Sequence, residues 1–189
     1  MLPLPLSQVQ AHWVRRLEAT FDELSRTRMA GLPVCHGGLR VQAVGCRPWQ
    51  VEAPAGTTGP TSPTGLLGVL ITPWFMNLVW RLDEGQQGAG DWLHLPVGTA
   101  GRLQMGSQSL SFMGHHDPEL GHYTACSLIS PMFQFADHAA AVATAEAVMD
   151  TVSSEHAARV APAAEAEAPA QPARRGFLLG RRHTAGDAA

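Results

Sequence analysis

Residues 66–80 read LLGVLITPWFMNLVW, the most apolar stretch of the chain. Pro73 divides this region into two runs, 66–72 and 75–82, each of a length typical of a β-strand. Glycine, proline and asparagine interrupt the stretch and Arg81 closes it, so it is too short and too broken for a membrane-spanning helix. We therefore predict two successive strands in a soluble domain, with no insertion into a membrane.

Amphipathic helices are predicted on both sides of these strands. Apolar residues recur at spacings of three and four within 7–30, where Ser7 is a plausible N-cap and Gly31 a stop signal. A second apolar stripe at helical spacing begins close to Asp137. Further short strands are expected at 40–46, 92–97, 102–106, 109–113 and 122–129. This order predicts an α+β fold, an antiparallel sheet with an N-terminal and a C-terminal helix packed on it as a two-layer sandwich.

The composition of the 189-residue chain excludes several classes of protein. Hydrophobic residues make up 45% and charged residues 15%, which allows a packed core. The formal net charge is -3, whereas a general nucleic-acid binder carries an excess of basic residues. Three isolated cysteines form no disulfide framework, and the N-terminus MLPLPLSQVQ lacks the features of a secretory signal. These features indicate a cytoplasmic protein.

The composition also changes along the chain, and the change defines three segments. Residues 1–159 hold nine arginines against thirteen acidic residues and form the expected domain. In 160–173 seven of fourteen residues are alanine and three are proline, which predicts a flexible linker. Residues 174–189 hold the remaining four arginines and form a basic, apolar-centred tail peptide, expected to be disordered on its tether.

The sequence contains no recognisable catalytic motif. No nucleophile elbow, phosphate-binding loop, dinucleotide fingerprint or C-x-x-C pair is present, and the chain has no lysine, so an unrecognised hydrolase has the least support. Metal ligands are densest at His115, His116, Asp117 and His122, within HHDPELGH. The D-P and L-G pairs favour an exposed turn between strands, and a nickel or iron site is the alternative. We expect neither a cofactor nor an enzymatic activity.

Two apolar segments are candidates for a binding site. In Thr72–Leu78, Trp74 and Met76 cannot share one face of a strand with Phe75, so the sheet is covered on both sides or one set lines a groove. The segment 127–137, SLISPMFQFAD, then seals a sheet edge or supplies a second wall of that groove. The candidate groove residues are Pro73, Trp74, Phe75, Met76, Asn77, Leu78, Ser130, Pro131, Met132, Phe133, Phe135 and Asp137.

The segments TPWFMNLVW at 72–80, GHYTACSLISPMFQFAD at 121–137 and RRGFLLGR at 174–181 resemble the HybE family of [NiFe]-hydrogenase assembly chaperones. The resemblance covers roughly residues 7–182. It implies an α+β fold and a role in hydrogenase maturation without enzymatic activity. Members with a rubredoxin module carry paired C-x-x-C motifs, which this chain lacks, so iron of that type is not expected.

The resemblance also implies partners: a [NiFe]-hydrogenase subunit, above all the small-subunit precursor with its twin-arginine signal, and other maturation factors. Such a signal needs an apolar groove and acidic acceptors for its arginines, for which Asp137 and Glu146 are candidates. The tail residues Arg174, Arg175, Phe177 and Leu178 are close to a twin-arginine signature, but Gly180 and two further arginines interrupt the apolar run. The tail therefore imitates the client, recruits another assembly factor or forms a terminal strand.

Overall fold

The computed structural model describes residues 5–51, 63–85, 95–105 and 108–160. Two helices flank six strands in the order α1 (Gln8–Arg26), β1 (Gln42–Gln50), β2 (Thr64–Ile71), β3 (Met76–Leu82), β4 (Ala100–Met105), β5 (Gln108–Asp117), β6 (Gly121–Ile129) and α2 (His138–Val160). All pairs of neighbouring strands are antiparallel, in the order β1-β2-β3-β6-β5-β4. The predicted α+β class, with one helix at each end of the domain, is confirmed.

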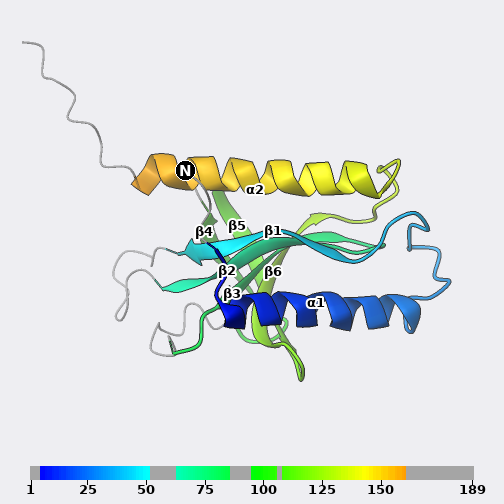
Figure 1. Ribbon diagram of the computed structural model, residues 1–189, viewed down its shortest axis with the longest axis horizontal. Coiled ribbons are helices and arrows are strands. Elements are labelled where there is room, and N and C mark those ends of the chain that lie inside the picture. The colour runs from blue at the N-terminus through cyan, green and yellow to red at the C-terminus, as the bar shows by residue number, and fades with distance from the viewer. Residues whose placement is uncertain (1–4, 52–62, 86–94, 106–107, 161–189) are drawn as a thin grey trace, which may run out of the picture.

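The two helices lie on opposite faces of the sheet, so the molecule has three layers instead of the expected two (Figure 1). Leu66 and Leu70 of β2 pack in one cluster with Trp13 of α1. Leu67, Val69 and Ile71 belong to the cluster on the other face, which α2 covers with Ala141, Ala145, Met149 and Val152. The reason is the continuous apolar run of β2, because successive residues of a strand point to opposite faces and both faces here need cover.

Strand β3 is likewise covered on both faces. For Thr72–Leu78 the sequence left two alternatives, a sheet covered on both sides or a set of residues that lines a groove, and the strand residues follow the first. Met76 and Leu78 are fully buried in the cluster beneath α2. Phe75 and Val79 pack in the cluster beneath α1, where the Phe75 ring meets the Phe21 ring edge-on at 5.8 Å. The apolar residues of this strand therefore hold the three layers together.

Helix α1 begins as predicted and ends earlier than predicted. The Ser7 side chain accepts a hydrogen bond from the Gln10 N–H, and the Gln10 side chain bonds back to the Ser7 N–H, which makes a capping box. The helix stops at Arg26, and turns occupy the remainder of the predicted helix. Val9, expected on the buried face, is 51% exposed. Gln10 is buried instead, where it donates a hydrogen bond to Asp83.

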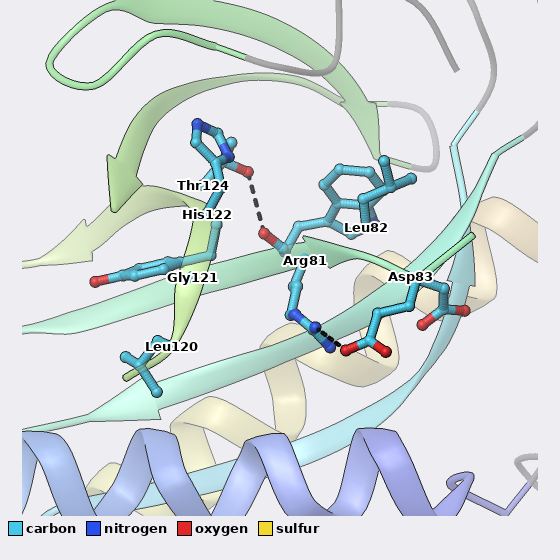
Figure 2. Close-up of a pocket in the computed structure, with 10 residues that line it drawn as sticks. Arg81, Leu82, Asp83, Leu120, Gly121, His122 and Thr124 are labelled. Carbon is cyan, nitrogen blue, oxygen red and sulfur yellow. Dashed lines mark hydrogen bonds and ion pairs between the residues drawn. The ribbon is translucent and has the colours of Figure 1, made fainter. Parts of the chain in front are cut away.

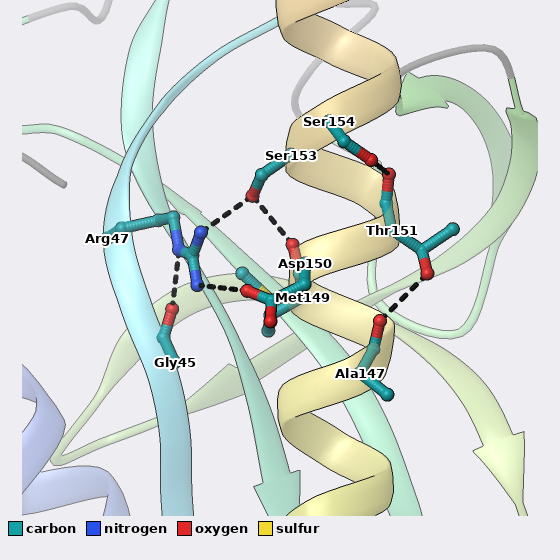
Figure 3. A network of polar contacts seen from close by, with 8 residues as sticks. All are labelled: Gly45, Arg47, Ala147, Met149, Asp150, Thr151, Ser153 and Ser154. Atoms are coloured by element: carbon teal, nitrogen blue, oxygen red, sulfur yellow. Dashed lines mark hydrogen bonds and ion pairs between the residues drawn. The ribbon is translucent and has the colours of Figure 1, made fainter. Parts of the chain in front are cut away.

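Strand β1 continues past Pro48, where the sequence predicted its end. The strand lies at the edge of the sheet, and a proline is tolerated there because its missing N–H removes no ladder bond. A register shift between Val44 and Arg47 bends the strand. Arg47 then ties β1 to α2, donating to the Gly45 backbone oxygen at 3.0 Å and to Ser153 Oγ at 2.7 Å (Figure 3).

Three other predictions have mixed outcomes. The strands expected at 102–106, 109–113 and 122–129 are present as β4, β5 and β6. The strand expected at 92–97 is reduced, within the described residues, to an isolated bridge between Val97 and Gly114. The linker and tail, 161–189, lie outside the described residues. Among the residues that are described, no helix is long and apolar enough to cross a membrane.

Candidate functional site

Three connections meet at one end of the sheet, beside the end of α1 and the start of α2 (Figure 1). They are the α1–β1 loop, the β2–β3 turn and the β6–α2 loop. The His36 N–H of the first donates to the Pro73 backbone oxygen of the second at 2.8 Å. The Ser130 hydroxyl of the third donates to the Trp74 backbone oxygen at 3.2 Å. The two segments that the sequence proposed as walls of one groove therefore lie side by side.

The β2–β3 turn is fixed by a single hydroxyl. Thr72 is fully buried, and its Oγ1 accepts hydrogen bonds from the Phe75 N–H at 3.0 Å and the Trp74 N–H at 3.3 Å. The Thr72 N–H also bonds to the Phe75 backbone oxygen at 2.9 Å. These bonds hold Trp74 at the tip of the turn with little freedom, so the turn is preorganised.

Exposed apolar side chains gather on these connections. Six large apolar side chains in the described part of the chain are exposed, and three of them are here: Phe133 at 55%, Leu32 at 43% and Val34 at 38%. The half-buried Trp74 and Phe75 contact each other on the β2–β3 turn, to which the other two connections are hydrogen-bonded. We call these five residues the loop surface. An exposed apolar patch on tied-down loops is the kind of surface that binds another protein or a peptide.

The structure separates the predicted groove residues into two sets. Met76, Leu78 and Met132 are fully buried, and Pro73 and Phe135 are buried too, so these five support the surface from beneath. Trp74, Phe75, Asn77, Ser130, Pro131, Phe133 and Asp137 keep exposed area. Binding of a client by either set stays a prediction.

Sequence reasoning missed the α1–β1 loop. Gly31 and Pro33 were interpreted only as the end of a helix, yet Leu32 and Val34 beside them are exposed. The ring of His36 lies 6.2 Å from the ring of Phe133, between centroids. The signal was present, because GLPV places two apolar residues in a segment whose glycine and proline exclude a regular element.

Asp137 is the N-cap of α2, close to where the sequence placed the start of the second helix. Its Oδ1 accepts a hydrogen bond from the Ala140 N–H at 2.8 Å.

His138, the residue after Asp137, is buried and is bonded on both ring nitrogens. The Arg40 N–H lies 3.5 Å from Nδ1, and Gln42 Oε1 lies 2.8 Å from Nε2. This arrangement suits the neutral imidazole, because Nδ1 then accepts and Nε2 donates.

Burial lowers the pKa of the His138 imidazole and the positive charge of Arg40 lowers it further, while Asp137 acts in the opposite direction. The unfolded chain therefore binds more protons near the unfolded pKa of about 6.5, and stability falls as the pH drops through that value. We expect the His138→Gln variant to flatten this slope by up to about 1.4 kcal/mol per pH unit. Urea unfolding between about pH 7.5 and about pH 5.5 measures it. A slope equal to that of the wild type would refute the assignment.

The histidine cluster is divided between the two faces of the sheet. His116 and His122 lie directly opposite each other on β5 and β6, so their side chains share one face. His115 and His116 are successive residues of β5, so their side chains point to opposite faces. The His115 ring stacks on Tyr123 at 5.3 Å, and Asp117 Oδ1 accepts backbone N–H bonds in the turn that follows. In the ranges that the structure describes, no three His, Cys, Asp or Glu residues are placed to hold a metal ion. The nickel or iron site that the sequence offered as the alternative, with His122 as a further ligand, stays a prediction.

A cavity of about 140 Å³ opens at the opposite end of the sheet, between the end of β3 and the start of β6 (Figure 2). The two strands pair as far as Trp80 and Thr124 and then separate. Arg81 lines the cavity, donates to Glu84 at 3.0 Å and lies 5.5 Å from the centre of the Trp13 ring. Because Arg81 contacts both its own strand end and α1, this region joins the sheet to the helix.

Comparisons with known proteins identify the family. The model described as "[NiFe]-hydrogenase assembly, chaperone, HybE" matches residues 12–180. Protein HoxT of Cupriavidus necator is 42% identical over 175 residues, 92% of each chain. The hydrogenase expression/formation protein HupT of Azotobacter chroococcum is 40% identical over 130 residues, 68% of this chain and 74% of that one.

A solution structure of HybE from Escherichia coli aligns with 97% of this chain and 96% of that chain, at 20% identity and a TM-score of 0.48. The family match spans the helices, the sheet and the loops that carry the loop surface. The chain belongs to the HybE family of [NiFe]-hydrogenase assembly chaperones.

Proposed function

We propose that this protein is a non-catalytic cytoplasmic chaperone that holds a [NiFe]-hydrogenase subunit until cofactor assembly is complete. The client is the small-subunit precursor, recognised through its twin-arginine signal region, and other maturation factors take part in its release. Membership of the assembly-chaperone family supports the general role. The choice of client and the binding site are the parts of this proposal that go beyond the family match itself.

The loop surface is the observation that carries this proposal. Phe133, Leu32 and Val34 are exposed although each would gain by burial, at about 25 cal/mol per Å² of apolar area removed from water. Hydrogen bonds between the three connections hold them in place before a partner arrives. The apolar segment of a signal peptide is a suitable ligand for such a surface, since it is apolar and variable in sequence.

Carboxylates near this surface are the candidate partners of the signal's arginines. Asp137 and Glu146 are both exposed on α2. Asp137 uses Oδ1 to cap the helix, and a carboxylate can accept further hydrogen bonds from a guanidinium. We therefore assign the apolar contacts the larger part of the affinity and the carboxylates a share in specificity.

Titration with a synthetic signal peptide tests the function. We expect a dissociation constant in the micromolar range, measured by calorimetry. Replacing the peptide's apolar segment by serine and asparagine should abolish binding, because the apolar contacts are lost. A peptide with intact apolar residues and glutamine for both arginines should bind more weakly but measurably. If the native peptide and its polar version bind equally, the proposal is wrong.

A further inference from the structure

The C-terminal peptide of this chain has the chemistry of a ligand for its own loop surface. Residues 173–182 read ARRGFLLGRR, three apolar residues between two pairs of arginines. The peptide lies outside the described residues, yet the family model extends to residue 180 and covers all of it except the second pair of arginines. A linker rich in alanine and proline separates it from α2. Most of the peptide is therefore part of the family pattern.

Chain length allows this peptide to reach the loop surface of the same molecule. Helix α2 begins beside that surface and runs for 23 residues to Val160, which corresponds to about 35 Å. Phe177 comes 17 residues after Val160, and a chain of that length spans at most about 56 Å when extended. The return path follows α2, which between His138 and His156 carries Glu146, Asp150 and Glu155 and no arginine. An acidic helix favours a peptide with four arginines.

We propose that Phe177, Leu178 and Leu179 bind in cis to the loop surface and compete with the client for it. This inference rests on the proposed function for its biological consequence, because the competition matters only if clients bind there. The arginine pairs on both sides of the apolar residues complement the carboxylates that α2 carries, and the apolar residues match Phe133, Leu32 and Val34. The free chaperone then shields its apolar surface until a stronger ligand displaces the tail.

The tether sets the strength of the competition. A tether of this length gives an effective concentration on the order of 1 mM at a site about 35 Å away. A tail with an intrinsic dissociation constant of about 0.2 mM would occupy the site most of the time and weaken client binding about sixfold. A client that binds in the micromolar range still displaces it.

Amide NMR of the full chain tests the contact without any client. We compare the wild type with a tail variant that carries Phe177→Ser, Leu178→Ser and Leu179→Ser. The expected result is a set of chemical-shift changes at the loop surface, absent in the control variant His183→Ser/Thr184→Ala. Phe133→Asp should release the tail and reproduce the free tail spectrum. Identical loop-surface spectra for the wild type and the tail variant would overturn the proposal, as would shifts that grow with protein concentration, which indicate a second copy.

Client affinity supplies the second measurement and separates the two proposals. The tail variant should bind the signal peptide severalfold more tightly than the wild type, because the competitor is gone. Equal affinities would overturn the competition even if the NMR contact were present. If neither protein binds the signal peptide while the tail variant still shifts the loop-surface amides, the proposed client is wrong and the cis contact stands.

Discussion

Replacing Gly65 with alanine is expected to lower the free energy of unfolding by about 3 kcal/mol or more, the upper end of the cost of overpacking a core. Gly65 is buried in β2, between Trp49 of β1 and Leu82 of β3. A Cβ at this position would lie 2.2 Å from the Arg81 backbone oxygen and 3.0 Å from Cε2 of Trp80. Rotation of a side chain cannot relieve the first contact, because both groups belong to paired strands.

Gly37→Ala is the matched control for this variant. Gly37 lies in the α1–β1 loop, and a Cβ there would meet no atom within 4 Å. We expect a change within about 0.5 kcal/mol, typical of surface substitutions. Urea unfolding followed by circular dichroism measures both variants, with equal slopes required for comparison. If Gly65→Ala proved no less stable than Gly37→Ala, the close packing of β2 against β3 would be contradicted.

The elements of the fold were accessible from the sequence because each has a local signal. Ser7 and Gln10 form the capping box that starts α1, and Asp137 caps α2. The interruption at Pro73 corresponds to a real turn between two strands. Because these signals depend on residues that are close in sequence, they can be recognised without knowledge of the tertiary structure.

The number of layers was not predicted, although the sequence contained the information. Residues 65–71 are all buried, and a strand that is buried on both faces requires a layer on each side. The expectation of two layers placed both helices on one face. Trp13 and Met149 lie in different clusters, on opposite faces of the sheet that β2 and its neighbours form. Which face each helix covers is a property of the topology, so local patterns do not decide it.

Sequence reasoning identified only part of the candidate site, again because local patterns do not decide which residues are exposed. Sequence reasoning placed Trp74 and Phe133 in one site, and the hydrogen bond from Ser130 to the Trp74 backbone brings their segments together. It did not distinguish Phe133, at 55% exposure, from Met132, which is fully buried. The two are adjacent in an irregular segment, where no periodicity assigns residues to an inner or outer face. Leu32 was missed because it lies in a loop that is distant in sequence.

Phe133→Asp is expected to weaken client binding about thirtyfold, or about 2 kcal/mol, as for an aromatic residue at the centre of an interface. The substitution removes the most exposed aromatic ring of the loop surface and adds a charge that would have to be desolvated on binding. Stability should change little, because the side chain is already largely in water. The conservative variant Phe133→Leu should retain most of the affinity, since an apolar side chain of similar reach remains.

Val9→Asp is the control that separates a local effect from a general one. Val9 is 51% exposed, close to the value for Phe133, and it lies in the first turn of α1, at the other end of that helix from the α1–β1 loop. Both substitutions place the same charge on a similarly exposed apolar position, so a general loss of hydrophobic surface would affect them equally. Calorimetric titration with the signal peptide should show less than about a twofold change for Val9→Asp, as for a residue outside the interface. Equal weakening by the two variants, or none by Phe133→Asp, would remove the loop surface as the client site.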